Sequence, residues 1–304
     1  MMPRPALGGL AAGGALVLAA ACWGFATVLS KQALDSLPPF ALLALQVSAS
    51  TGFLWMAAAV TRTPVRLSGN NWKALASGLL EPGLAYAVAL PGLALTSAGS
   101  ASVIGAAEPA FICALVWALT GRRPRTGVLL ALGATSMGVV LVTTSGPAGV
   151  AVGSPNPLLG NALILLGTGC AAVYVVASHR LVSHMAPLPL VVLQQSAGLV
   201  FALGLWAAAV ASGVEARPPP LTAALLAVAA LSGILQYALA FWLYLYGLRR
   251  VPAETAGVFL ALAPLFGLSG AALVLGEMPG QLQLAGALLV VFAVAALSRS
   301  ANQA

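Results

Sequence analysis

Glu108 is the residue of this sequence whose position most needs a chemical explanation. It lies near the middle of an apolar segment, 98–120, and is followed directly by Pro109. A carboxyl group in such a segment can bind and release a proton, which is the chemistry of proton coupling. The alternative is a glutamic acid hydrogen-bonded within a helix bundle, where it would only fix helix packing.

Glu81 is a second carboxyl group inside an apolar segment, 74–95, and it lies nearer the start of that segment. It is a candidate proton relay to Glu108, or a residue that lines the entrance to the same site. A solvated carboxylate at a helix end is the alternative. Pro82 and Pro91 interrupt the same segment.

Pro109 and Pro264 are hinge candidates. Proline has no amide hydrogen, so each removes one helical hydrogen bond, to the carbonyl of Gly105 and of Leu260 respectively. A helix broken in this way can flex, whereas a static kink is the alternative.

Other polar and aromatic side chains within apolar segments are candidates for lining a substrate cavity. The amides either face a cavity or join helices, and the rings either wall a site for an amphipathic or cationic molecule or pack against lipid. These cavity candidates are Trp23, Gln46, Tyr86, Tyr174, Gln194, Tyr237 and Trp242.

The sequence offers no metal or cofactor chemistry. His179 and His184 flank Arg180 without HExxH spacing or a third ligand, and the three cysteines show no CxxC pattern. No Walker motif is present, so ATP does not power the protein directly. We therefore expect no metal, no cofactor and no enzymatic activity.

The composition explains where these residues must sit. Of 304 residues, 61% are hydrophobic and only 6% are charged, whereas soluble domains carry about 25% charged residues. Such a chain cannot cover a water-soluble surface, which excludes a soluble enzyme and a nucleic-acid-binding domain. The expected solvent is a lipid bilayer.

Apolar runs long enough to cross a bilayer occur ten times. No run alternates polar and apolar residues as a membrane barrel does, so the expected class is an all-α integral membrane protein. The expected spans are 8–30, 39–60, 74–95, 98–120, 127–145, 158–180, 187–211, 221–247, 252–275 and 281–298. The turn between the third and fourth spans is expected from Pro91 and Gly92 to Ser100.

The basic residues predict an orientation. If both termini are cytoplasmic, only Lys31 and Arg217 fall on the outer side, which agrees with the positive-inside rule. The basic residues on the cytoplasmic side are Arg4, Arg62, Arg66, Lys73, Arg122, Arg123, Arg125, Arg180, Arg249, Arg250 and Arg299.

Matching residues in the two halves indicate a duplication. Pairs 155 residues apart are Gly121 with Gly276, Pro109 with Pro264, and Gly92 with Gly247. Pairs 148 apart are Gln46 with Gln194 and Ser30 with Ser178, and Tyr86 matches Tyr237 at 151. Because five spans is an odd number, the two halves should enter the membrane from opposite sides. The predicted organisation is a first repeat at 1–145, an extracytoplasmic Gly- and Pro-rich linker at 146–157, a second repeat at 158–298 and a cytoplasmic tail at 299–304.

The chain resembles the drug/metabolite transporter superfamily, and within it the ten-span EamA-type exporters. The resemblance rests on Trp23-Gly24, Glu108-Pro109, the Gly-Arg and Gly-Glu-x-x-Pro endings at Gly121 and Gly276, and the duplication. It implies a central cavity lined mainly by spans one, three, four, six, eight and nine. Two departures stand out: Arg122 replaces a common glutamate, and Gln46 stands where many members have a basic residue.

Together these features predict a secondary transporter. It would export a small neutral or zwitterionic metabolite, such as an amino acid, across the plasma membrane by alternating access, with protons as a candidate coupling ion. Phosphate-bearing substrates are disfavoured because no span carries Arg or Lys at depth. Export of lipophilic cations or drugs, an intramembrane enzyme and a non-transporting membrane scaffold are the alternatives.

Overall fold

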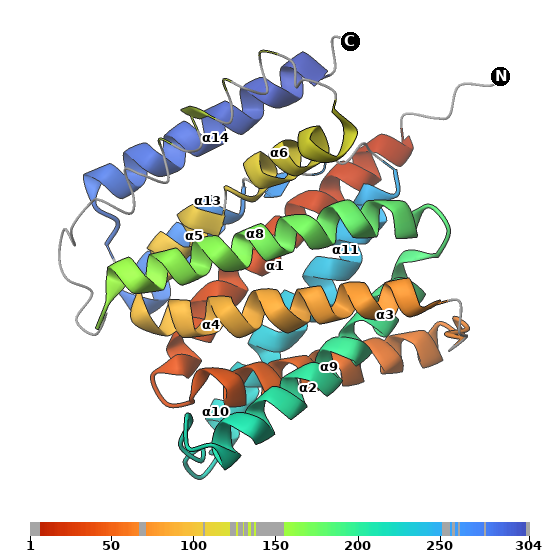
Figure 1. Ribbon diagram of the computed structural model, residues 1–304. Helices are drawn as coiled ribbons and strands as arrows, with labels where there is room; N and C mark the ends of the chain where they lie inside the picture. Colours follow the sequence, from red (N-terminus) through yellow and green to blue (C-terminus); the bar gives the residue numbers. More distant parts are fainter. Residues whose placement is uncertain are drawn as a thin grey trace.

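The computed structural model describes residues 7–66, 71–105, 107–121, 126, 130, 133–134, 137, 155–250, 256, 259–260, 262–276 and 278–301. Every regular element in these residues is a helix (Figure 1). In the first half they are α1 (Leu7–Leu34), α2 (Pro39–Val60), α3 (Trp72–Gly78), η2 (Leu79–Leu84), α4 (Ala85–Leu95), α5 (Ala98–Gly105) and α6 (Glu108–Thr120). In the second half they are α8 (Pro157–Val182), α9 (Pro187–Ala211), α10 (Ala223–Gly233), η3 (Ile234–Leu239), α11 (Ala240–Leu248), α13 (Ala263–Gly270), η4 (Ala271–Leu275) and α14 (Gln281–Ala301).

Seven helical stretches in the described residues are long and apolar enough to cross a membrane. They are 11–34, 39–60, 72–95, 98–119, 157–182, 187–211 and 223–248, close to seven of the expected spans. Shorter apolar helices cover 263–275 and 281–293. Most of the expected fifth span and part of the ninth lie outside the described residues, as does most of the linker.

The third stretch is interrupted at one proline and not at the other. Glu81 has an extended backbone (φ −148°, ψ 121°), because the ring of Pro82 disfavours helical geometry in the residue before it. Pro91 lies inside α4, which continues to Leu95. The expectation that Pro91 and Gly92 help to form the turn is therefore wrong, and the turn after α4 begins at Thr96.

The fourth stretch is divided just before Glu108. α5 ends at Gly105, and α6 begins at Glu108 with Pro109 in its first turn, where the missing amide hydrogen leaves no helical bond unmade. Pro109 thus follows the point where α5 ends, and it does not bend a continuous helix. Pro264 likewise stands in the first turn of α13, next to Ala263.

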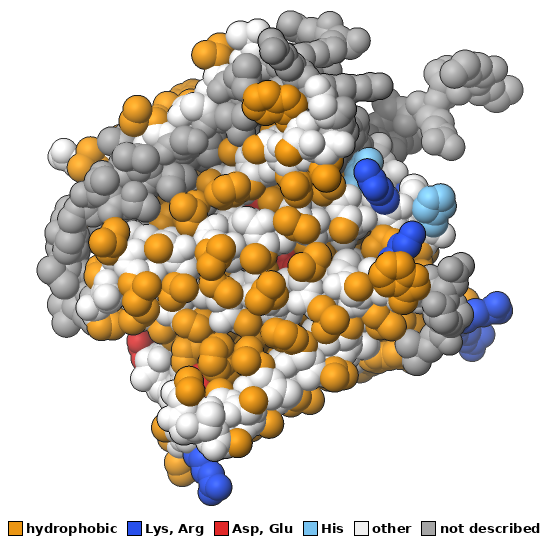
Figure 2. All heavy atoms as spheres, in the orientation of Figure 1, with side chains coloured by type: hydrophobic (Ala, Val, Ile, Leu, Met, Phe, Trp, Pro, Cys, Tyr) orange, Lys and Arg blue, Asp and Glu red, His pale blue; other side chains and the backbone are white. Residues whose placement is uncertain are grey.

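The helices pack as neighbours that are far apart in sequence. α2 packs against α9, α4 against α8, and α1 against α11 and α13 (Figure 1). α14 lies at the far edge from α2 and contacts α5. Hydrophobic side chains cover most of the face drawn in Figure 2, and the blue basic groups lie toward its ends. This distribution fits a helix bundle surrounded by lipid.

Gln46 is completely buried between helices. Its Nε2 donates to Ser30 Oγ on α1 at 2.8 Å and to Ser232 Oγ on α10 at 2.8 Å. Tyr237 donates its hydroxyl to Gln46 Oε1 at 3.4 Å. The amide therefore joins α1, α2 and the interrupted helix of the second half.

Gln194 makes the corresponding cluster on the other side. Its Nε2 donates to Ser77 Oγ on α3 and to Ser178 Oγ on α8, both at 3.0 Å. Its Oε1 accepts from the Tyr174 hydroxyl at 2.9 Å. Because Ser77 is followed by Gly78 as Ser232 is followed by Gly233, the two clusters use matched positions.

Two glycines bring the interrupted helices against these glutamines. A Cβ at Gly78 would lie 2.1 Å from the Gln194 carbonyl oxygen, and one at Gly233 would lie 2.4 Å from that of Gln46. Each glycine ends an α-helix that continues as a π-helical segment, η2 or η3. The bounds of η2 and η3 lie 155 residues apart. At this separation Tyr86 aligns with Phe241, so the predicted alignment of Tyr86 with Tyr237 is wrong.

Candidate functional site

A cavity of about 160 Å³ lies at the centre of the bundle. A volume of this kind holds on the order of ten water molecules, or one small solute. Its lining comes from α1, η2, α4, α5, α6, α8, η3, α11 and the start of α13. These elements belong to the spans that the family resemblance implied for a cavity.

Glu81 reaches the cavity from the break in the third stretch. Its side chain is buried, with 6% of its surface exposed, and it lines the cavity. The extended backbone at Glu81 separates α3 from α4, so the carboxyl group lies between two helical pieces. Its place is the bundle interior, and the alternative of a solvated carboxylate at a helix end is wrong.

Glu108 reaches the same cavity from the break in the fourth stretch. It is the first residue of α6, where the helix dipole favours a nearby negative charge. It is half-buried because it faces the cavity. The two interruptions in the first half of the chain thus each carry one carboxyl group into the cavity.

The two carboxyl groups form an acidic pair. Both line the same cavity, which is otherwise largely apolar. Among the described residues that line the cavity there is no Lys or Arg to neutralise them. Two like charges in a site of low polarity repel, so the pair is suited to hold a cation, either a proton or an ammonium group.

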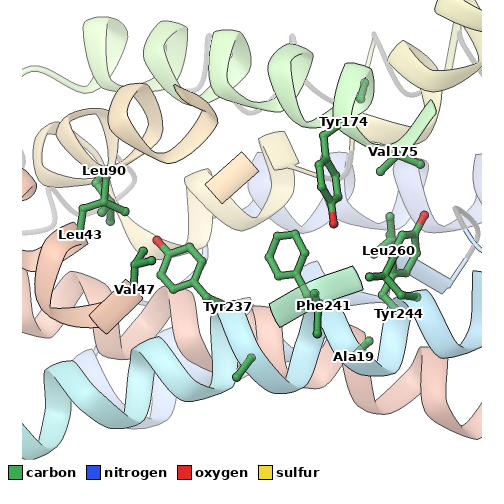
Figure 3. Close-up of a cluster of buried hydrophobic side chains, with 14 of the residues drawn as sticks. Ala19, Leu43, Val47, Leu90, Tyr174, Val175, Tyr237, Phe241, Tyr244 and Leu260 are labelled. Carbon is green, nitrogen blue, oxygen red and sulfur yellow. The ribbon is translucent and has the colours of Figure 1, made fainter. Parts of the chain in front are cut away.

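Aromatic rings form part of the cavity wall. Trp23 packs edge-on against Phe241 (5.3 Å between centroids, 74°) and Tyr244 (5.5 Å, 67°). Tyr174 extends from α8 toward Phe241 on α11, at 5.6 Å (Figure 3). Tyr86 also lines the cavity and contacts Tyr237 at 4.6 Å. The wall can receive an apolar or cationic group on its ring faces.

Of the seven cavity candidates, Trp23, Tyr86 and Tyr174 come together in the lining, beside the proton-coupling candidates Glu81 and Glu108. The other four do not. Gln46 and Gln194 are wrong as cavity residues, because their amides are used between helices. Tyr237 is fully buried behind Tyr86, and the half-buried Trp242 packs against the core outside the lining.

Gln236, Phe241, Ser102 and Tyr244 are among the lining residues that sequence reasoning missed. Gln236 occupies in η3 the place that Glu81 has in η2, so the separation of 155 residues would have found it. Phe241 is found in the same way from Tyr86. Ser102 and Tyr244 are buried hydroxyls without a hydrogen-bond partner among the described residues, a property that no sequence pattern carries.

The described residues hold no group of three His, Cys, Asp or Glu side chains that could bind a metal ion. The functional groups that line the cavity are carboxyl, amide, hydroxyl and aromatic groups.

A family comparison matches both halves of the chain. The model of the EamA-like transporter family matches residues 11–144 and again residues 158–299. The chain belongs to the EamA-like transporter family. The double match also establishes two repeats, whose boundary falls between 144 and 158. This EamA-like chain is thus a multi-pass membrane protein of a transporter family.

A solved crystal structure of a protein shares this fold with the EamA-like chain. The two are 22% identical, with a TM-score of 0.65, over 93% of this chain and 97% of that one. At this identity the likeness concerns the fold alone. A comparison with curated proteins finds no match to the chain.

Proposed function

We propose that this EamA-like chain is a secondary transporter that exports a small neutral or zwitterionic metabolite, such as an amino acid or a related molecule. The observation that carries the proposal is the acidic pair, Glu81 and Glu108, inside a central cavity walled by aromatic rings. Such a cavity binds a solute with a positive group and an apolar body.

The hydroxyl groups of the cavity favour a zwitterion. Tyr244 and Ser102 are buried in the lining, their hydroxyls unpaired within the described part of the chain, and Gln236 adds an amide. Unpaired buried polar atoms are unfavourable, so a ligand that pairs with them gains affinity. The ammonium group of a zwitterion would bind the acidic pair, and its carboxylate would accept hydrogen bonds from these hydroxyl and amide donors.

Proton exchange at the acidic pair supplies a coupling mechanism. A cationic group and a proton compete for the same carboxylates, so loading one releases the other. Glu108 is the primary proton-coupling candidate because it is the more exposed of the two acids in the cavity, and Glu81 is its relay. Pro109 and Pro264, in the first turns of α6 and α13, are the candidate hinges, where one helical piece can turn relative to the next.

Alternating access by two inverted repeats of five spans completes the proposal. The matched glutamine clusters and π-helical segments support equivalent halves. α6 ends at one end of the bundle and α8 begins at the other, which supports a fifth span at 127–145 between them (Figure 1). With ten spans, both termini are cytoplasmic and the membrane is the plasma membrane.

Counterflow into proteoliposomes tests the substrate class. Purified protein is reconstituted with one unlabelled solute inside, and uptake of labelled zwitterionic amino acids is compared with uptake of lipophilic cations. The proposal expects saturable uptake of a zwitterion that Glu81→Gln and Glu108→Gln each reduce. Uptake of no solute in a broad metabolite panel would instead favour a membrane scaffold.

Export of lipophilic cations is the second candidate. It is favoured by the aromatic wall around two carboxyl groups, because ring faces attract cations as well as apolar groups. Replacing Tyr244 by Phe discriminates the two. Loss of a hydroxyl donor should weaken zwitterion uptake, whereas it should leave cation uptake unchanged.

A further inference from the structure

A second hollow lies outside the central cavity, where two helices end. Basic side chains from segments far apart in sequence surround it: the end of α8 and the end of α11. It is lined by His179, Arg180, Val182, Ser183, His184, Leu248, Arg249 and Arg250. Both pale-blue histidines of Figure 2 lie at the end where most of its blue groups gather. No carboxylate is among the described residues of this lining.

The hollow lies at the depth of lipid headgroups. α8 has 26 residues, and the stretch that ends with α11 also has 26. At 1.5 Å per residue each is roughly 39 Å long, more than the hydrocarbon core of about 30 Å. Their last turns therefore extend into the headgroup layer.

The basic groups differ in how they are held. Arg250 stacks on the Tyr246 ring, with its Cζ 3.6 Å from the ring centroid, and its Nη1 donates to the Tyr246 carbonyl at 3.0 Å. Arg180 and Arg249 are exposed, and the described residues give their guanidinium groups no partner. A guanidinium group can donate two parallel N–H hydrogen bonds to the oxygens of one phosphate. Arg180 and Arg249 therefore offer N–H donors that no described residue uses.

The hollow also has an apolar floor. Val182 and Leu248 are 1% and 2% exposed, and they lie between the basic side chains. An ion surrounded by water gains nothing from such a floor, whereas a lipid can place its glycerol there and its chains along the apolar helix surfaces. The positive-inside rule accounts for basic residues at this end, but it does not require them to converge on one hollow.

We propose that this hollow binds the phosphate headgroup of an anionic phospholipid, with Arg180 and Arg249 as its main phosphate donors. The site joins the ends of α8 and α11 through one bound lipid. It requires only that the chain spans a membrane, so it holds whether or not the transport proposal does.

Lipid titration of the purified full-length protein tests the site. Delipidated protein in detergent is titrated with phosphatidylglycerol or phosphatidylcholine, and bound lipid is counted by native mass spectrometry. Each basic residue near a lipid surface contributes about 1 kcal/mol, so Arg180→Gln with Arg249→Gln should weaken phosphatidylglycerol binding roughly thirtyfold. The matched control, Arg62→Gln with Arg66→Gln, removes the same charge from exposed positions outside the hollow and should leave binding unchanged.

Three results would overturn the proposal: equal binding of the two lipids by the native protein, equal weakening in the two double variants, or full displacement of phosphatidylglycerol by millimolar inorganic phosphate. Arg180→Lys with Arg249→Lys keeps the charge and should retain most of the binding, which separates loss of the site from loss of the fold.

Discussion

At the scale of single residues, the two repeats differ most where the cavity carries its charge. Glu81 of the first repeat corresponds to Gln236 of the second, and Glu108 corresponds to Ala263, each at a separation of 155 residues. All four line the cavity. The first repeat thus supplies both acids of the cavity, while the second supplies an amide and a methyl group. The acidic groups of the cavity therefore come from one repeat, although the helices that carry them have counterparts in the other.

Gln194 gives the sharpest stability prediction at this scale. Gln194→Leu removes the hydrogen bonds that the amide makes with the hydroxyls of Ser77, Ser178 and Tyr174, and this should lower the free energy of unfolding by about 1–3 kcal/mol. The neighbouring Gln195 is equally buried, but its Nε2 has no hydrogen-bond partner among the residues that the structure describes.

Gln195→Leu is therefore the control, and it should cost clearly less stability than Gln194→Leu. Both variants can be compared by denaturation in mixed micelles. Equal losses would contradict the assignment of Gln194 as the residue that joins α3, α8 and α9.

At the scale of elements, the interruptions of the helices decide where the site forms. The sequence correctly predicted most apolar helices, because length and hydrophobicity determine them. It could not place the breaks in detail. Pro82 ends a helix and Pro91 does not, although both are prolines within one apolar segment. Which proline breaks a helix depends on the packing of neighbouring helices, and no local pattern carries that information.

The same limit explains the glutamines. Both were expected to face either a cavity or another helix, and their residue type could not decide between the two. The glutamines lie between helices because Gly78 packs closely against Gln194 and Gly233 against Gln46. This packing brings the serine before each glycine to the glutamine amide.

Gly78→Ala tests that close approach. The added Cβ would lie 2.1 Å from the Gln194 carbonyl oxygen, so the helices must separate, and the unfolding free energy should fall by about 1–3 kcal/mol. Gly52→Ala is the matched control, because a Cβ there meets no atom within 4 Å. In a helix interior that change should stabilise by up to about 1 kcal/mol. Stabilisation by both substitutions would contradict the packing described.

At the scale of the whole molecule, the repeat organisation determines the topology. The double family match divides the chain close to the expected linker. With the proposed fifth span, each repeat has five spans and the chain has ten. Lys31 fits this topology, since its Nζ donates to the carbonyls of Leu93 and Ala94 at the end of α4 on the proposed outer side.

Reporter fusions test the ten-span topology directly. Alkaline phosphatase is active only outside the cytoplasm, and green fluorescent protein is fluorescent inside it. Phosphatase fused after residue 36, 97, 150 or 216 should be active, and green fluorescent protein fused after residue 66, 122, 184 or 301 should be fluorescent. An inactive phosphatase at 150 would contradict a fifth span and, with it, the inverted arrangement of the repeats.

The most direct test of the central claim measures proton-driven accumulation of substrate by proteoliposomes under an imposed pH gradient. Protein carrying native Glu108 should accumulate its substrate above equilibrium, and collapse of the gradient should abolish this. Glu108→Gln should still exchange substrate in counterflow, at a reduced rate, but should lose accumulation, while Asp35→Asn, which changes an exposed loop carboxylate, should behave as the native protein does. Accumulation that persists unchanged in Glu108→Gln would contradict a coupling role for the acidic pair.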